Sequence, residues 1–219
     1  MLKIISTSDG SDTVYIPSIN EYYHSLNGAM QESKHVFIEA GYNKTALNPV
    51  KILELGFGTG LNTLLTLKES LKDGRDVEYI TAEKFPLPEN ILKSLNYSRL
   101  FPAGQKSLFK LIHDCEWENT CMISNNFSLL KLKKDFRDIE LNTSVDLVYF
   151  DAFAPEKQPE LWTFDVLSPL CSLINKGGVF VTYSARGQLK RDLTRLGFSV
   201  EHLPGPPGKR HITRAIKTG

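Results

Sequence analysis

The sequence predicts an α/β fold built on a mostly parallel β-sheet, and three observations indicate it. From residue 49 onward, short apolar stretches alternate five times with helix-like stretches, as in a parallel sheet covered by helices. A glycine-rich turn over residues 56–60 joins the first of these strands to the first helix. Two strand-like stretches then close the chain, so we expect a seven-stranded sheet with an antiparallel last strand.

The individual elements follow from the spacing of apolar residues and from the glycines and prolines at their ends. We expect strands at residues 51–55, 76–83, 120–124, 145–150, 179–183, 198–203 and 210–217. We expect helical segments at residues 61–71, 88–96, 129–136, 158–174 and 188–196, and a helix and loop at residues 101–118. Gly177 and Gly178 are expected to end the helix before them, and the linker 204–208 to form a surface loop.

The first 48 residues differ from the rest of the chain. They are polar, rich in aromatic residues and only weakly periodic. A short β-hairpin is expected at about residues 4–15 and a helix at about residues 31–40. The chain therefore divides into an N-terminal extension, residues 1–48, and an α/β domain, residues 49–219.

The composition is that of a soluble globular protein. Hydrophobic residues make up 41% and charged residues 23% of the 219 residues, and no apolar run approaches the roughly 20 residues that span a bilayer. The N-terminus lacks the features of a signal peptide. Three cysteines without metal-ligand spacing favour the reducing cytoplasm over a disulfide framework. The net charge of +1 leaves a nucleic-acid partner open, provided that basic residues are clustered.

The glycine-rich turn is a candidate ligand-binding loop. Gly56, Gly58 and Gly60 let the backbone approach a ligand closely, and the following helix offers free N–H groups. Position 61 is leucine, so the turn lacks the third glycine of the dinucleotide-binding pattern. With Glu54 before the glycines and the closing strand, this turn resembles that of class I S-adenosylmethionine-dependent methyltransferases, which are Rossmann-like. The resemblance implies that Glu54 orients the loop or meets the methionine amino group through water.

Two further residues are candidates for contacts with an adenosine moiety. Glu83 ends the second expected strand, where a carboxylate can accept hydrogen bonds from both ribose hydroxyls. Asn126 follows the third expected strand and could contact adenine through its side chain; alternatively, it only stabilises a turn. S-adenosyl-L-methionine is the expected cofactor.

Asp151 is the candidate catalytic residue and a possible cofactor contact. It ends the fourth expected strand, and ligands bind at the carboxyl ends of strands in open α/β sheets. Methyl transfer to an amine needs alignment and an unprotonated nitrogen, and a carboxylate can accept the proton. Phe153 could stack on a flat acceptor ring. The alternative is that Asp151 only caps the next segment.

The residues 23–37, 54–62 and 150–162, with 82–86 and 208–210, resemble the methyltransferase domain of the MnmC family, including its stand-alone form. The resemblance implies N-methylation of 5-aminomethyl-2-thiouridine at the wobble position of tRNA, giving 5-methylaminomethyl-2-thiouridine. It adds Phe57, Asn62 and Lys84 to the cofactor site. It adds to the substrate site the residues Glu32, Ser33, Pro155, Lys157, Lys209 and Arg210, and it makes the N-terminal extension a lid.

The resemblance also implies partners. Bifunctional members carry a flavin-dependent oxidase domain after the methyltransferase domain. The sequence ends at Gly219, so we expect no flavin and a separate enzyme that supplies the aminomethyl group. The tRNA anticodon stem-loop would contact basic residues, of which Lys209 and Arg210 are the best placed. The five histidines have no metal-ligand spacing, so no metal and no membrane is expected.

Three alternatives stay open on the residues alone. The chain could methylate a small-molecule or protein amine. It could be an oxidoreductase that binds NAD(P), which also uses a glycine loop and an acidic strand end, although the glycine spacing and the closing strand pair weigh against this. It could also be a catalytically silent binding domain.

Overall fold

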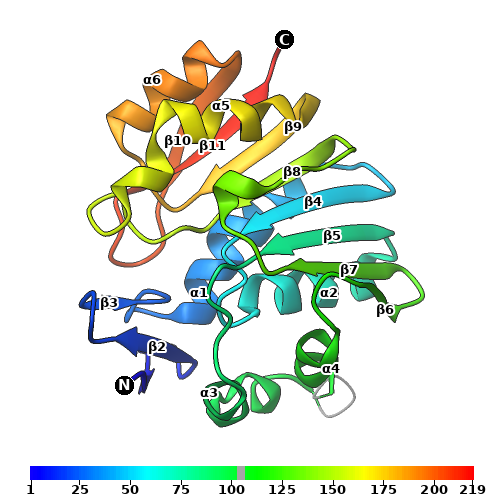
Figure 1. Ribbon diagram of the computed structural model, residues 1–219, viewed down its shortest axis with the longest axis vertical. Helices are drawn as coiled ribbons and strands as arrows, with labels where there is room; N and C mark the ends of the chain where they lie inside the picture. The colour runs from blue at the N-terminus through cyan, green and yellow to red at the C-terminus, as the bar shows by residue number, and fades with distance from the viewer. Residues whose placement is uncertain (103–106) are drawn as a thin grey trace.

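The computed structural model describes residues 1–102 and 107–219, and an eight-stranded sheet forms its centre (Figure 1). The strands are β4 (Val50–Leu55), β5 (Val77–Ala82), β6 (Thr120–Ser124), β7 (Phe127–Leu132), β8 (Val145–Phe150), β9 (Ile174–Thr182), β10 (Phe198–Pro204) and β11 (His211–Lys217). Their order across the sheet is β10-β11-β9-β8-β4-β5-β7-β6. The neighbours from β9 to β7 are parallel, and β11 is antiparallel to both β9 and β10. The α/β fold with an antiparallel last strand is confirmed.

Helices cover both faces of the sheet because the strands alternate their side chains between two cores. Ile52 belongs to one apolar core and Leu53 to the other. Burial of these apolar surfaces is the main stabilising contribution. The first core includes α1 (Ala29–Ser33), the π-helical segment η1 (Lys34–Glu39), α2 (Leu61–Asp73) and α4 (Leu108–Asp114). The second core includes α5 (Phe164–Ser172) and α6 (Gly187–Arg195).

The third expected strand, 120–124, is present as β6, but the helix expected at 129–136 was wrong, because strand β7 lies there. β6 is an edge strand antiparallel to β7, and β7 itself takes the place beside β5 where a helix at 129–136 was expected. Phe127, Leu129 and Lys131 are all buried and alternate with less buried residues, which is the period of a strand. The sheet therefore has eight strands instead of seven.

Other boundaries also differ from the prediction. β9 begins at Ile174, so Gly177 and Gly178 lie inside a strand, where the pairing with β8 shifts register. In the stretch expected to be helix and loop, 101–118, the structure describes α4; residues 103–106 lie outside the described residues. The short elements α3 (Glu89–Ser94), η2 (Tyr42–Lys44), η3 (Tyr97–Arg99), η5 (Phe136–Asp138) and η6 (Pro159–Trp162) complete the chain's described helical segments.

The N-terminal extension forms a small antiparallel sheet of three strands, β1 (Lys3–Ser6), β2 (Asp12–Ile16) and β3 (Glu21–Tyr22). It lies in front of the carboxyl ends of the central strands (Figure 1). Val14, Phe37 and Tyr42 are fully or almost fully buried in the same core as Ile52. The extension is thus packed against the α/β domain.

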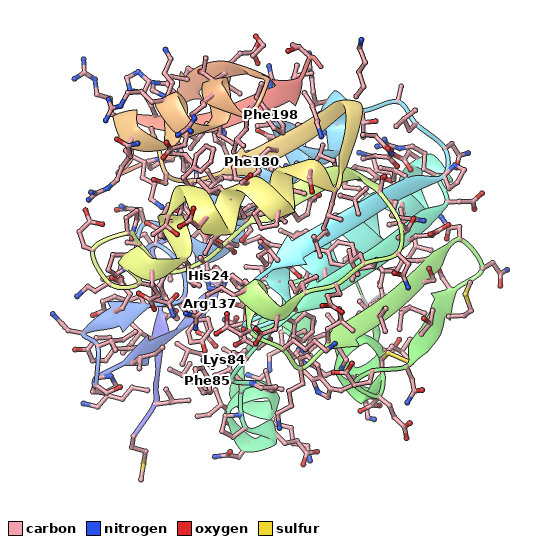
Figure 2. The ribbon with its side chains drawn as sticks, turned by 45° about the horizontal axis from the view of Figure 1, so that its top comes forward. His24, Lys84, Phe85, Arg137, Phe180 and Phe198 are labelled. Atoms are coloured by element: carbon pink, nitrogen blue, oxygen red, sulfur yellow. A yellow bond between two sulfur atoms is a disulfide. The ribbon has the colours of Figure 1, made fainter. Side chains whose placement is uncertain are left out.

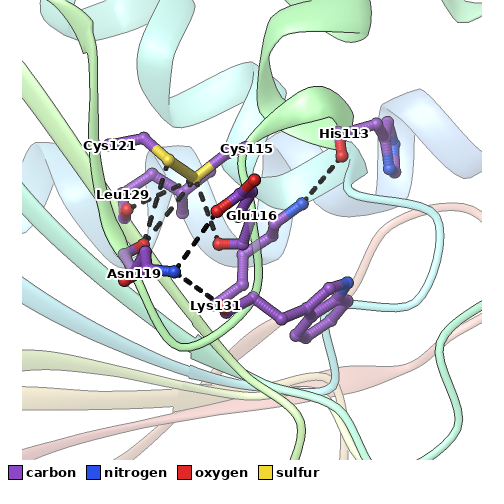
Figure 3. Close-up of a disulfide and its surroundings, with 8 residues drawn as sticks. His113, Cys115, Glu116, Asn119, Cys121, Leu129 and Lys131 are labelled. Atoms are coloured by element: carbon purple, nitrogen blue, oxygen red, sulfur yellow. Dashed lines mark hydrogen bonds between the residues drawn. A yellow bond between two sulfur atoms is a disulfide. The ribbon is translucent and has the colours of Figure 1, made fainter.

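The prediction against a disulfide was also wrong. Cys115 and Cys121 are joined by a disulfide, with their Cα atoms 5.9 Å apart (Figure 3). Cys115 lies just after α4 and Cys121 lies on β6, so the bond ties a helix to the edge of the sheet. Cys171 is buried and free. Spacing along the sequence did not indicate the pairing, because it depends on how α4 packs against β6.

Candidate functional site

A cavity of about 770 Å³ opens at the carboxyl ends of β4, β5, β7 and β8. This is the edge at which open α/β sheets bind ligands, and the volume lies within the ordinary range for ligand pockets, roughly 300–1,000 Å³. Residues of the N-terminal sheet line the opposite wall. Figure 2 shows His24, Lys84, Phe85 and Arg137 gathered between these two walls.

The glycine loop brings the backbone into contact with Asp151. Gly56 has a φ of +100°, and a Cβ atom there would lie 2.6 Å from the carbonyl oxygen of Asp151. Gly58 has a φ of +48°, and a Cβ atom there would lie 2.8 Å from the ring of Tyr23. Only glycine fits both the dihedral angles and the space. The loop is therefore packed between the β8 end and the N-terminal extension.

Glu54 lies beneath the loop and does not line the cavity. Its side chain is fully buried, and Oε2 accepts hydrogen bonds from the hydroxyls of Thr63 (3.1 Å) and Thr81 (2.8 Å). Burial raises the pKa of Glu54 to about 8. Its Oε1 atom has no hydrogen-bond partner in the structure. Glu54 thus joins β4 to α2 and β5 from below.

Glu83 lines the cavity at the end of β5. Its Oε2 atom accepts a hydrogen bond from the Gly58 backbone N–H at 3.1 Å, and Oε1 accepts one from the Phe85 N–H at 2.8 Å. Burial raises the pKa of Glu83, although these backbone donors oppose the shift. Each oxygen retains a further lone pair for a ligand hydroxyl.

Asn126 lies at the other end of the sheet, which corrects its prediction as a cofactor residue. Asn126 lies in the turn between β6 and β7, and its side-chain amide donates to the carbonyl oxygens of Ser70 (2.9 Å) and Arg75 (2.8 Å). The physical reason is that residues 127–132 form strand β7 beside β5, where a helix had been expected at 129–136. Because β7 is the strand beside β5, the loop that reaches the cavity is the one after Leu132.

That loop supplies Asp135, Phe136 and Arg137, which the sequence reasoning missed. Asp135 accepts hydrogen bonds from the Arg137 guanidinium and from Lys84 Nζ (2.9 Å), and these bonds lower its pKa. The burial of β7 alternates along the strand, but its sequence does not alternate in the same way, so no clear signal placed the end of a strand just before these residues.

Asp151 is held by the first turn of α2. The Asn62 side-chain amide donates to Asp151 Oδ2 at 2.8 Å, while Asn62 Oδ1 is buried without a partner. Burial raises the pKa of Asp151 to about 7; the Asn62 hydrogen bond opposes the shift, Glu32 adds to it and Lys209 opposes it. The carboxylate can therefore exchange a proton near neutral pH.

Aromatic and charged side chains surround Asp151 on the side of the N-terminal extension. Tyr23 and Phe153 meet edge to face, with ring centroids 5.2 Å apart. The Tyr183 hydroxyl donates to the Ala152 carbonyl at 2.7 Å. Lys209 Nζ lies 2.5 Å from Glu32 Oε1 and 3.7 Å from the centroid of the Tyr183 ring.

His24 lies beside this group, on the segment after β3. Its backbone N–H donates to the Thr13 hydroxyl at 3.0 Å. Burial lowers the pKa of His24 to about 4, so the ring is neutral at physiological pH. Tyr23 and His24 belong to a stretch that resembles the MnmC family, but neither residue was predicted as part of the site.

Phe57 lines the cavity, but its ring packs behind the loop. The ring lies 5.2 Å from His113 and 5.9 Å from Trp117, with the Lys131 ammonium 5.5 Å from its centroid. Lys131 is almost fully buried and donates to the His113 carbonyl at 2.9 Å (Figure 3). Burial lowers the pKa of Lys131 to about 8. This cluster braces the glycine loop from behind.

The remaining predicted site residues do not line the cavity. Ser33 is buried, and Gly60 contacts His113 behind the loop. Lys157 donates to the carbonyls of Ile19 and Asn20, which ties the loop after β8 to the N-terminal extension. Two further predicted residues are Pro155, which is partly buried, and Arg210, which is exposed. Among the described residues, no cluster of three or more acidic, histidine or cysteine side chains could hold a metal ion.

No helix in the described part of the chain is both long and apolar enough to cross a membrane.

Comparisons with known proteins agree with this geometry. The family described as S-adenosyl-L-methionine-dependent methyltransferase matches residues 117–218. The bifunctional tRNA 5-methylaminomethyl-2-thiouridine biosynthesis protein MnmC of Leptospira interrogans is 35% identical over 206 residues, 88% of this chain and 32% of that protein. Its counterpart from Chromobacterium violaceum is 29% identical over 88% of this chain. The chain spans about a third of the length of these curated relatives.

A solved structure is similar over the whole chain. The crystal structure of MnmC2 from Aquifex aeolicus has a TM-score of 0.81 and 30% sequence identity, and the match covers 100% of this chain and 71% of that one. A glycopeptide N-methyltransferase solved with sinefungin has a TM-score of 0.50 at 14% identity, which shows a shared fold alone.

Proposed function

Since this chain belongs to the MnmC family of methyltransferases, we propose that it transfers a methyl group from S-adenosyl-L-methionine to the amine of 5-aminomethyl-2-thiouridine at the tRNA wobble position. The product would be 5-methylaminomethyl-2-thiouridine. The names of the relatives support the substrate, and the cavity supports the chemistry.

The cavity residues fit the proposed methyl donor. Gly56 and Gly58 present backbone to the cavity, and Glu83 offers carboxylate oxygens for ribose hydroxyls. Asn62 Oδ1 is a buried acceptor without a partner, and such atoms are rare unless a ligand or water meets them. The loop Asp135 to Arg137 replaces Asn126 as the proposed contact for adenine.

When bound, S-adenosyl-L-methionine supplies a methyl group on a positively charged sulfur, so that an N–C bond forms as the S–C bond breaks and its electron pair stays on sulfur. The acceptor amine is mostly protonated in water and must lose a proton before its lone pair is free. Asp151 is proposed to take that proton because its pKa of about 7 matches the operating pH. Asn62 fixes the direction of the carboxylate.

The other residues are proposed to position the acceptor. The rings of Tyr23 and Phe153 offer an aromatic wall for a flat nucleobase. Glu32 and Lys209 close the cavity from the N-terminal extension and from the loop between β10 and β11. Residues 1–48 would then act as a lid on the acceptor side, with Lys157 fastening it.

One observation carries the proposal: the glycine loop and the helix after it both contact Asp151, the loop at its backbone and the helix at its carboxylate. The Gly56 backbone packs on the Asp151 carbonyl, and Asn62, in the helix after the loop, donates to the same residue. A methyl donor on the loop and an amine at Asp151 would thus be neighbours. An oxidoreductase that binds NAD(P) would give no role to a carboxylate poised to exchange a proton at this point.

The test is mass spectrometry of wobble nucleosides from tRNA that carries the aminomethyl group, after incubation with the protein and S-adenosyl-L-methionine. We expect a gain of one methyl group on that nucleoside. The Asp151→Ala variant should lose turnover by about 100-fold or more while retaining S-adenosylhomocysteine binding. Methylation of free amines or proteins without methylation of this tRNA would instead support a different acceptor.

A further inference from the structure

We call the side of the cavity around Glu32 and Tyr183 the acceptor half, and the side around Glu83 and Asp135 the cofactor half. The acceptor half already holds an alkylammonium group, that of Lys209. Three of the described cavity residues are cationic: Lys84, Arg137 and Lys209. The first two pair with Asp135 in the cofactor half. Lys209 alone of these three turns toward the acceptor half, where its ammonium lies against Glu32 and over the Tyr183 ring.

The surroundings of this ammonium are those that an amine acceptor needs. A carboxylate oxygen lies 2.5 Å from Nζ, and an aromatic ring centroid lies 3.7 Å away. A carboxylate together with the face of an aromatic ring binds ammonium groups by charge and by the cation–π interaction. Asp151 is close enough for both Glu32 and Lys209 to shift its pKa.

Glu32 is built to hold a cation. Its side chain is only 9% exposed, and Oε2 accepts a hydrogen bond from the Ser25 backbone N–H at 2.8 Å. A carboxylate this buried is costly to leave unpaired, so any departure of Lys209 calls for another cation in its place. A protonated amine on the acceptor would meet that requirement.

The backbone of the loop that carries Lys209 is held by hydrogen bonds, while the Lys209 side chain is partly exposed. The Gly205 N–H donates to the Arg210 carbonyl at 3.1 Å, and the His35 ring contacts the Pro204 carbonyl at 2.8 Å. The Lys209 side chain is 29% exposed at the edge of the cavity. Its four methylene groups can therefore swing out without movement of the backbone.

We propose that the Lys209 ammonium is a stand-in for the acceptor: it occupies the position between Glu32 and Tyr183 in the free protein, and the acceptor's ammonium displaces it. Glu32 then holds the acceptor as a cation beside Asp151, which takes its proton. This inference rests on the proposed function, and it makes Glu32 and Lys209 determinants of specificity for amines.

The stand-in acts as an internal competitor, so removing it should strengthen amine binding. The test compares two anticodon stem-loops, one with the 5-aminomethyl group and one with a 5-methyl group, by fluorescence anisotropy with S-adenosylhomocysteine present. The ratio of the two dissociation constants isolates the contribution of the ammonium. This measurement needs no turnover. A protein that does not methylate tRNA can therefore be told apart from a protein in which Lys209 does not compete with the acceptor amine.

In the Glu32→Gln variant, we expect the preference for the amine to fall about 10-fold or more, because a charged partner is lost. In the Lys209→Met variant, we expect it to rise about 5-fold. The Lys209→Arg variant keeps a cation at this position and should show the wild-type preference. Lys176→Met, at an exposed position near the start of β9, is the matched control and should change nothing.

The pH dependence gives a second readout that a purely structural role would not move. The charged and titratable groups coupled to Asp151 are Glu32, Lys209, Tyr183 and Glu54, and the neutral His24 is coupled to Glu32 and Lys209. In Lys209→Met, the acid limb of kcat/KM should move to higher pH, because that limb reports the free enzyme. The limb of kcat should stay in place, since Lys209 has already left the complex.

Three results would overturn the inference. One is an unchanged amine preference in Glu32→Gln that still binds S-adenosylhomocysteine. Another is a weaker preference in Lys209→Met. The third is an equal shift, in Lys209→Met, of the acid limbs of kcat/KM and of kcat, which would mean that Lys209 stays beside Asp151 in the complex.

Discussion

At the scale of single residues, the buried carboxyl of Glu54 beneath the glycine loop makes the stability of the fold depend on pH. Its pKa is raised from 4.5 to about 8 by burial, so the folded protein holds a proton that the unfolded chain releases. A carboxyl with a raised folded pKa stabilises the fold at pH below its unfolded pKa. That contribution is lost as the pH rises through the folded pKa.

We therefore predict that the free energy of unfolding falls between about pH 5 and pH 8, by up to about 1.4 kcal/mol per pH unit from Glu54, and that Tm falls with it. The Glu54→Gln variant should show a flatter dependence, because an amide does not titrate. Some slope will remain, since the pKa values of Asp151 and Glu83 are raised as well. Differential scanning calorimetry across this range is the measurement. The exposed Glu140→Gln variant serves as control, and an equal slope in Glu54→Gln and wild type would contradict the prediction.

The residues that were predictable from sequence are those whose neighbours along the chain define them. Gly56, Glu83 and Asp151 each follow a strand that was correctly placed, and the cavity brings them together. Tyr183 and His24 were missed because their place in the site depends on contacts between distant segments. No local pattern signals that an aromatic residue after β9 will face a lysine from the last loop.

At the scale of elements, the disulfide joins α4 to β6, and these elements adjoin the cluster behind the glycine loop. Closing this short loop should stabilise the protein by about 2 kcal/mol through the entropy of the unfolded chain. The Cys121→Ser variant should accordingly melt about 4–8 °C lower than the oxidised wild type. A reductant should lower the Tm of the wild type to that of the variant. It should leave the variant itself unchanged.

Peptide mapping after alkylation without reductant is the direct check on this pair. If Cys115 and Cys121 are both alkylated in the native protein, the disulfide is absent in solution and the stability difference should vanish. The buried Cys171 should stay unmodified in the folded protein, because burial raises the pKa of its thiol to about 12.

Strand β7 shows where prediction of elements failed. Its sequence, 127–132, has leucine at 129, 130 and 132, so it lacks a clear period of two, and a helix at 129–136 was expected instead. The fold buries Lys131 between Phe57 and Trp117, a placement that tertiary packing decides and local propensity does not. The neighbouring strands had stronger signals and were predicted correctly.

At the scale of the whole molecule, the net charge of +1 would limit the electrostatic attraction of the proposed tRNA substrate. Several basic residues already have acidic partners, among them Arg186 with Glu156 and Arg214 with Glu201. Arg210 is exposed beside the cavity loop. Affinity for tRNA should then rest on few phosphate contacts and should weaken modestly with salt.

We predict that Arg210→Ala weakens binding of the anticodon stem-loop and reduces the slope of log affinity against log salt by about one. Filter binding over about 50–200 mM salt is the measurement. Lys44→Ala, at an exposed position before β4, is the matched control. A slope that is the same in Arg210→Ala and in the control would remove Arg210 from the tRNA interface.

The walls of the cavity have a consequence for how the protein becomes active during translation. Tyr23 and Lys209 face the same space, although nearly the whole chain separates them. A ribosome-bound chain that has produced the glycine loop and Asp151 still lacks one wall of its own pocket. The loop that carries Lys209 joins β10 to β11, and β11 lies between β9 and β10, so the last interior strand of the sheet and the last wall of the pocket are completed together.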